Sequence, residues 1–232
     1  MKSSMKKNKE SKDGALVFDM DGTLVDTSGD IVHSINHIRD MLGQCPLSSE
    51  EVLRYIGHGN PHLLSHVTGI EEGDPELERV RQTFREFYLA HQTERSHPYP
   101  GIRDALECLA RDYDYDLYVL SNKPHVAVLA ELKGHMLFSY FKAIWGAGAL
   151  AHMKPDPIGI QTAANMSGLS LLKTVMIGDM LPDIQAARNA GSKSCFVSWG
   201  FGKISPEFPT PSAIIDSVAE LVPKVAAIID TA

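Results

Sequence analysis

Short runs of consecutive apolar residues recur along the chain, each bounded by turn-forming or polar residues. A run of this kind, without alternation of polar and apolar positions, is typical of a strand that is buried on both faces of a parallel sheet. Such runs lie at 15–18, 116–120, 142–145, 174–177, 194–198 and 213–215.

Stretches with helical periodicity separate the later runs from one another. They lie at 102–112, 125–137, 157–167, 183–190 and 217–230. Strands that alternate with helices predict a parallel sheet covered by helices on both faces. We therefore expect an α/β fold with a Rossmann-like, doubly wound parallel core.

The segment 25–97 interrupts this alternation directly after the first strand, because it contains no strand-like run. Its apolar residues recur at helical spacing, as Ile31, Ile35 and Ile38 do, and glycine- and proline-containing turns separate several short helices. The chain therefore predicts an all-helical domain at 25–97, inserted into an α/β core formed by 15–24 and 98–232. The first fourteen residues, rich in lysine and serine, predict a disordered basic tail.

Composition and charge narrow the classes of function. The chain has 232 residues, 44% hydrophobic and 22% charged, with a formal net charge of -7. The first fourteen residues are basic, so the remaining body is more acidic still. Binding to nucleic acid or to an anionic membrane depends on lysine and arginine that neutralise phosphates, so we expect neither partner.

Three scattered cysteines, Cys45, Cys108 and Cys195, form no Cys-x-x-Cys pair and fit a reducing compartment better than a disulfide framework. The chain has no run of eighteen apolar residues and no apolar segment typical of a secretory signal. These features predict a cytoplasmic protein without a membrane span. They leave open whether it is a monomer or a homodimer.

Polar residues whose side chains could take part in catalysis or in binding follow several of the predicted strands. Ligands of open parallel sheets bind beyond the carboxyl ends of the strands, so these residues are expected to meet at one edge. Each also has an ordinary structural explanation, as a turn aspartate, a helix cap or a solvated lysine. Their succession at strand ends favours a site. They are Asp19 and Asp21 after the first strand, Ser121 after the second, Lys154 after the third, and Asp179 and Asp183 after the fourth.

These residues carry a family resemblance. Residues 18–27, FDMDGTLVDT, resemble the first motif of the haloacid dehalogenase superfamily of phosphohydrolases. Ser121, Lys154 within KPDP, and GDMLPD at 178–183 resemble its second, third and fourth motifs. The helical insert is similar to the small helical cap class, and 99–110 with 120–124 are most similar to the phosphoglycolate phosphatases within that superfamily. A family hydroxyl residue is replaced by Met180, which predicts altered packing without loss of metal binding.

The resemblance implies a mechanism and a cofactor. It implies that Asp19 is a nucleophile that forms an aspartyl-phosphate, and that Asp21 is the general acid and base. It implies Mg²⁺ held by Asp19, Asp179 and the carbonyl oxygen of Asp21, with Asp183 orienting this shell. Lys154 would supply a second positive charge against the phosphate.

It also implies where a small phosphorylated metabolite would bind. Ser121 and Asn122 would hold the phosphate, with Gly22 and Thr23 shaping the adjacent loop. Lys123 is left out of catalysis, because contact with the substrate and a solvated side chain explain a lysine at this position equally well. In the insert, His58 between Gly57 and Gly59 is the candidate substrate contact.

Two other interpretations remain at this stage. One is a phosphosugar mutase resembling β-phosphoglucomutase, and the other is a non-catalytic phospho-aspartate switch or pseudo-enzyme. The insert also contains histidine pairs, His33 with His37 and His62 with His66, spaced to share a helix face. They allow a transition-metal site, but no carboxylate or cysteine spacing supports it, so polar helix faces are expected.

Overall fold

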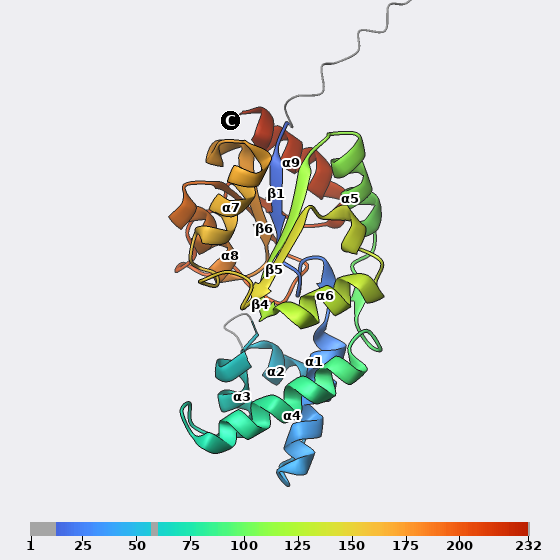
Figure 1. Cartoon of the computed structure of the whole chain (residues 1–232), viewed down its shortest axis with the longest axis vertical. Helices are drawn as coiled ribbons and strands as arrows, with labels where there is room; N and C mark the ends of the chain where they lie inside the picture. Colours follow the sequence, from blue (N-terminus) through green and yellow to red (C-terminus); the bar gives the residue numbers. More distant parts are fainter. Residues whose placement is uncertain (1–12, 57–59, 232) are drawn as a thin grey trace, which may run out of the picture.

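The computed structural model describes residues 13–56 and 60–231, in which a lobe built on a sheet sits beside a lobe of helices (Figure 1). Most of the expected basic tail, and the turn with His58, lie outside the described residues. Within the described part of the chain, no helix is both long enough and apolar enough to cross a membrane.

Six parallel strands form the sheet, in the order β5-β4-β1-β6-β7-β8. Every neighbouring pair is parallel, which confirms the predicted α/β fold class. The strands are β1 (Ala15–Phe18), β4 (Asp116–Pro124), β5 (Ala143–Ala147), β6 (Thr174–Gly178), β7 (Lys193–Val197) and β8 (Ala213–Ile215). All six coincide with the apolar runs of the sequence.

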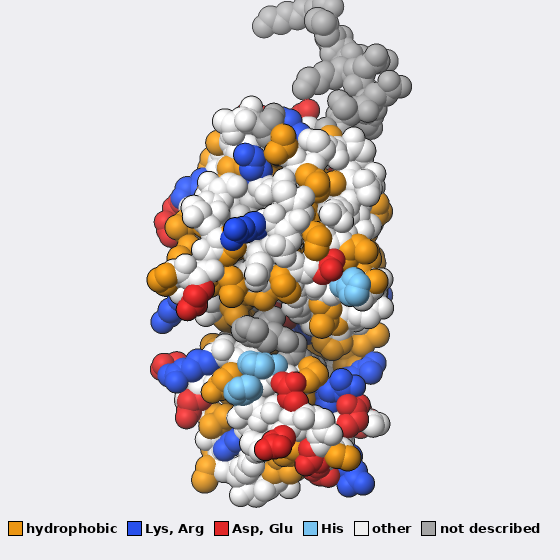
Figure 2. All heavy atoms as spheres, turned by 90° about the vertical axis from the view of Figure 1, so that its left-hand side faces the viewer, with side chains coloured by type: hydrophobic (Ala, Val, Ile, Leu, Met, Phe, Trp, Pro, Cys, Tyr) orange, Lys and Arg blue, Asp and Glu red, His pale blue; other side chains and the backbone are white. Residues whose placement is uncertain are grey.

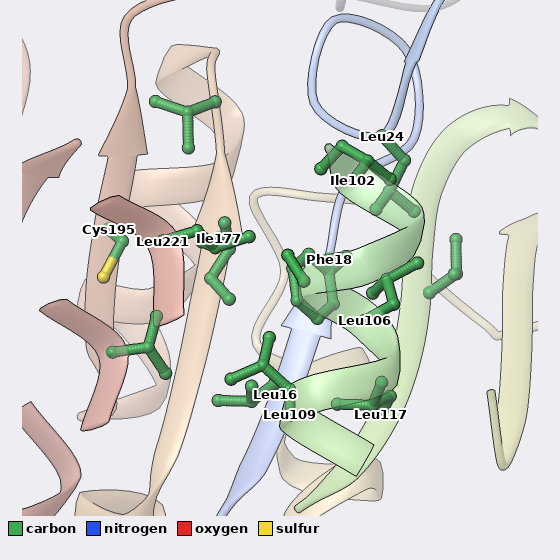
Figure 3. Close-up of a cluster of buried hydrophobic side chains, with 14 of the residues drawn as sticks. Leu16, Phe18, Leu24, Ile102, Leu106, Leu109, Leu117, Ile177, Cys195 and Leu221 are labelled. Atoms are coloured by element: carbon green, nitrogen blue, oxygen red, sulfur yellow. The ribbon is translucent and has the colours of Figure 1, made fainter. Parts of the chain in front are cut away.

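Helices cover both faces of this sheet. Neighbouring residues of a strand point to opposite sides, so a strand that is apolar throughout presents apolar side chains to both faces. Leu16 and Phe18 of β1 face α5 (Ile102–Arg111), as Figure 3 shows, and α6 (His125–Gly134) and α9 (Leu221–Asp230) contribute to the same apolar cluster. Ala15 and Val17 face the other cluster, which includes α7 (Ile158–Ser167) and α8 (Leu181–Ala190). Short 3-10 turns complete the lobe at Phe138–Tyr140, Leu171–Lys173 and Val218–Glu220.

The second lobe is built from four helices with their own apolar core. They are α1 (Ser28–Met41), α2 (Ser49–Leu53), α3 (Asn60–Thr68) and α4 (Pro75–His91). The predicted periodicity is confirmed in α1, where Ile31, Ile35 and Ile38 are all buried in this core. Ala127 of α6 belongs to the same cluster, so the two lobes are in direct apolar contact. Figure 2 shows acidic and basic side chains intermixed on the face of this lobe that is in view.

The connection between the lobes differs from the sequence expectation. The ends of the segment expected to be wholly helical form a short antiparallel ribbon, β2 (Val25–Asp26) with β3 (His97–Pro98). Two-residue strands are too short to produce a periodic pattern, so the prediction of no strand there was wrong. Asp30 of α1 holds the returning chain, because its carboxylate accepts hydrogen bonds from three backbone N–H groups within 93–96.

Candidate active site

The order of the strands brings the predicted site residues together. β1 lies between β4 and β6, so the residues that follow these three strands emerge side by side at one edge of the sheet. Asp19 follows β1, Asp179 follows β6, and Ser121 lies near the end of β4. After β1 the chain adds β4 and β5 on one side, and it then returns to the other side of β1 to add β6, β7 and β8. The point where the strand order reverses in this way is the usual place for a ligand in an open α/β sheet.

The loop after β1 is shaped around the carboxylate of Asp179. Gly22 has a positive φ of 81°, and any side chain at this position would collide with Asp179. Thr23 is fully buried and donates a hydrogen bond of 3.0 Å from its hydroxyl to Asp179 Oδ1. Thr23 does not line the cavity described below.

A second loop, which the sequence interpretation missed, also contacts Asp179. The backbone N–H groups of Phe201 and Gly202 donate to Asp179 Oδ2, at 2.7 and 3.2 Å. The signal was the pair Gly200 and Gly202 just after β7, where any added side chain would collide with Asp179. These donors hold the carboxylate in a single orientation.

Lys154 lies at the centre of a buried charge cluster. Its ammonium is 2.8 Å from Asp19 Oδ1 and 2.6 Å from Asp183 Oδ1. Asp183 Oδ2 accepts the N–H of Met180, so both oxygens of Asp183 already have protein partners. This arrangement supports an orienting role for Asp183.

Asn122 holds the loop that carries Lys154. Its amide donates to the carbonyl oxygen of Lys154 at 2.9 Å, and its amide oxygen accepts the N–H of Lys154 at 3.0 Å. Ser121 is buried next to it, and its hydroxyl accepts the N–H of Lys123 at 3.2 Å. Strand β4 continues to Pro124, so these residues extend the strand, and Ser121 does not cap the following helix.

Burial and mutual repulsion set the proton affinities in the cluster. Burial raises the pKa of Asp19 to about 7, with Lys154 opposing and Asp183 reinforcing this shift. Burial, followed by the charges of Asp19 and Asp183, raises the pKa of Asp179 to about 8. Burial alone would lower the pKa of Lys154, but its two aspartates outweigh burial and raise it. When Asp19, Asp179 and Asp183 are all ionised, their three negative charges exceed the one positive charge of Lys154, and burial together with this excess makes Asp19 and Asp179 hold their protons more tightly.

This donor set fits a hard divalent cation. Oxygen atoms of Asp19, Asp179 and Asp183 lie within 4.8 Å of one another, and all three side chains are buried. Lys154 pairs with Asp19 and Asp183, whereas Asp179 has only neutral donors among its hydrogen-bond partners in the described chain. Oxygen donors with uncompensated negative charge are what Mg²⁺ prefers.

Lys123, for which the sequence left both a substrate contact and a solvated side chain open, is buried. Only 8% of its side chain is exposed, and its ammonium lies 2.9 Å from Asp21 Oδ1. Burial alone would lower the pKa of Lys123, but nearby negative charge, led by Asp21, raises it. Tertiary folding, which places β4 opposite the loop after β1, created this contact, and of the two explanations left open for Lys123 the solvated one does not hold.

A cavity connects these residues to the helical lobe. Its sheet-lobe side includes the acids and lysines already described, together with Ser121, Asn122 and Met180. Its helical-lobe side is mainly apolar and includes Ile31, Ile56 and Phe84. Arg85 of α4, which is exposed, supplies positive charge on that side. The cavity thus pairs a polar floor with an apolar roof that excludes water.

The histidines that the structure describes in the helical lobe make ring contacts. His37 stacks on Phe87 with ring centroids 3.8 Å apart, and the ring centroids of His62 and His66 are 4.1 Å apart. Among the described residues, the metal-binding geometry is found at the three aspartates and not at these histidines. His58 lies outside the described residues.

Comparison with known proteins places the chain in a family. Residues 16–197 match the model of the haloacid dehalogenase-like hydrolases. A phosphoglycolate phosphatase of Agrobacterium fabrum is 32% identical over 210 residues, which cover 89% of this chain and 90% of the relative. One of Neisseria meningitidis serogroup A is 32% identical over 215 residues, covering 89% and 91%.

Solved structures agree with this match. The crystal structure of a predicted phosphoglycolate phosphatase from Haemophilus somnus 129PT superposes with a TM-score of 0.82 at 26% identity, covering 91% of this chain and 97% of the other. The matched range includes the buried acids and Lys154 that the sheet gathers at its edge. The chain is therefore an enzyme of the haloacid dehalogenase-like hydrolase family.

Proposed function

We propose that this enzyme hydrolyses a small phosphomonoester, with phosphoglycolate as the first candidate substrate, in the presence of Mg²⁺. One observation carries the proposal: Asp19, Lys154 and Ser121 lie together on the floor of a cavity that the helical lobe covers. The names of the relatives at about 32% identity point to the same substrate class.

In the first chemical step, a carboxylate oxygen of Asp19 attacks phosphorus. The bond between phosphorus and the ester oxygen breaks, and the departing alkoxide takes a proton from Asp21. Lys154 lies 2.8 Å from Asp19 Oδ1, which places its positive charge where the phosphate oxygens gather charge. The products of this step are the alcohol and an aspartyl-phosphate on Asp19.

In the second step, water attacks the same phosphorus atom and gives a proton to the carboxylate of Asp21. The bond between phosphorus and the Asp19 oxygen breaks, which releases inorganic phosphate and restores both carboxyl groups to their starting states. Ser121 and the neighbouring backbone hold phosphate oxygens during both steps. The apolar roof excludes other water from the cavity.

Mg²⁺ would be held by the carboxylates of Asp19 and Asp179 and by the carbonyl oxygen of Asp21. When bound, it supplies positive charge that offsets the repulsion between a carboxylate and a phosphate dianion. Asp183 orients Lys154 through their 2.6 Å ion pair. Thr23, Phe201 and Gly202 keep the Asp179 carboxylate in place.

The test is phosphate release from a panel of phosphoglycolate, sugar phosphates, nucleotides and pyrophosphate, with Mg²⁺ or with EDTA. We expect Mg²⁺-dependent turnover without any bisphosphate activator, and loss of turnover in Asp19→Asn. Asp116→Asn is the matched control, because Asp116 is also buried and paired with a lysine, but it lies at the opposite end of β4.

Mass spectrometry of the quenched reaction should show one added phosphoryl group on the wild-type chain and none on Asp19→Asn. No turnover of any panel member would contradict the proposal. Conversion of a sugar phosphate only when a bisphosphate is present would favour a mutase instead.

A further inference from the structure

Lys123 lies where the two lobes meet, in contact with both. Its ammonium is 2.9 Å from Asp21 Oδ1 in the sheet lobe and 2.5 Å from the hydroxyl of Tyr88 in the helical lobe. It also lies 4.6 Å from the centroid of the Tyr88 ring. An ammonium has three N–H donors, so a single lysine can hold both partners at once.

The contacts of Asp21 distinguish its two carboxyl oxygens. Oδ1 accepts hydrogen bonds from Lys123 at 2.9 Å and from the hydroxyl of Thr27 at 2.7 Å. Oδ2 accepts no hydrogen bond from the residues that the structure describes, and Asp21 lines the cavity. A proton on Oδ1 would point at hydrogen atoms that Lys123 and Thr27 already donate to it. A proton carried by Asp21 is therefore expected on Oδ2.

Tyr88 brings the helical lobe into this arrangement. It is a buried residue near the end of α4, whose Phe84 and Leu89 line the cavity roof. If the helical lobe moves away from the sheet lobe, Lys123 loses its Tyr88 partner. The orientation of Asp21 is thereby linked to the position of the roof.

We propose that Lys123 is a positioning residue for the general acid: with Tyr88 it fixes Asp21 through Oδ1, leaves Oδ2 to transfer the proton, and makes this geometry depend on closure of the helical lobe. This inference rests on the proposed function, in which Asp21 protonates the leaving group.

The test compares substrates that differ in their need for a proton. An alkyl phosphomonoester leaves as a strongly basic alkoxide, whereas para-nitrophenyl phosphate leaves as a stabilised phenolate. We expect Lys123→Met to lower kcat about 100-fold for the alkyl ester and less than about 3-fold for the aryl ester. KM for both should stay within about 2-fold, because the lysine holds Asp21 and not the substrate.

Asp21→Asn sets the benchmark for loss of the acid and should show the same dependence on the leaving group. In the double variant, Lys123→Met should add little to Asp21→Asn, because both changes remove the same proton transfer. Tyr88→Phe retains the ring and should lower kcat for the alkyl ester about 3- to 10-fold with KM unchanged. Lys142→Met, which removes a lysine paired with Asp116 away from the site, is the control.

Each outcome decides the matter. Equal loss on both substrates would show a structural role and overturn the proposal, and a rise in KM with unchanged kcat would assign Lys123 to substrate binding. If Lys123→Met does not fold, Tyr88→Phe and its double variant with Asp21→Asn give the same comparison. A wild-type enzyme without turnover would refute the proposed function itself, whereas an active wild type with a uniform Lys123 effect refutes only this inference.

Discussion

Titration of Asp179 should make the metal-free protein less stable as the pH rises. The side chain is fully buried, and burial, then Asp19 and Asp183, raises its pKa from 3.8 to about 8. The folded chain therefore binds this proton more tightly than the unfolded chain does. Between these two pKa values the folded state holds more protons, so the free energy of unfolding falls as the pH rises.

The size of the effect follows from the width of that interval. The part of that interval between about pH 5 and pH 8 covers about three pH units. Each unit changes the free energy of unfolding by at most about 1.4 kcal/mol, so the loss over this range is at most about 4 kcal/mol. Asparagine at 179 removes the charge, but it also weakens the hydrogen bonds from Phe201 and Gly202, which are stronger to a carboxylate. We therefore expect the free energy of unfolding of Asp179→Asn, relative to that of the wild type, to rise by about 2 to 3 kcal/mol as the pH is raised over this range.

The assay is urea unfolding followed by circular dichroism near pH 5 and pH 8.5, with EDTA throughout. Asp116→Asn serves as the control, because it replaces a buried aspartate that lies away from the cluster. Mg²⁺ at about one hundred times its dissociation constant should then restore about 2.7 kcal/mol to the wild type at the higher pH, and nothing to Asp179→Asn.

A wild type and an Asp179→Asn variant with the same dependence on pH would refute this reasoning. It would mean that the buried carboxylate does not carry the charge penalty that its surroundings impose. Stabilisation of Asp179→Asn by Mg²⁺ as large as that of the wild type would place the metal elsewhere.

Three further outcomes are expected. Gly22→Ala should weaken Mg²⁺ affinity by at least about 10-fold in calorimetric titration, because its positive φ and the adjacent Asp179 carboxylate leave no room for a methyl group; unchanged affinity would contradict this. Leu106→Ala, fully buried against the sheet, should lower the free energy of unfolding by about 2 to 5 kcal/mol in urea, and a loss below about 1 kcal/mol would show that the site collapses. Asp30→Asn should lower stability by about 1 to 3 kcal/mol and speed proteolysis within 93–96, because an amide cannot accept every hydrogen bond that its two oxygens now accept; proteolysis at the wild-type rate would argue against this anchoring role.

The strands were predictable because each is buried on both faces. A residue such as Val17 has apolar neighbours whichever way it points, so its run of apolar positions is continuous and visible in the sequence. The helices α5 and α9 were predictable for the complementary reason, since their buried residues recur at helical spacing on one face.

The positions of Asp19, Asp179 and Lys154 could also be inferred, because each follows a predicted strand and the carboxyl ends of parallel strands share one edge. Their resemblance to family motifs added the expected roles. Their proton affinities could not be inferred, because they depend on burial and on distances between residues far apart in the chain.

The sequence by itself determined the α/β class, the helical insertion and the edge of the sheet at which the acids collect. Tertiary structure alone decided the partners of these residues. It placed the N–H groups of Phe201 and Gly202 on Asp179, and it buried Lys123 between Asp21 and Tyr88. Local patterns record whether a residue is buried and how its segment folds, whereas such pairings depend on which distant loops the packed core brings within hydrogen-bond distance.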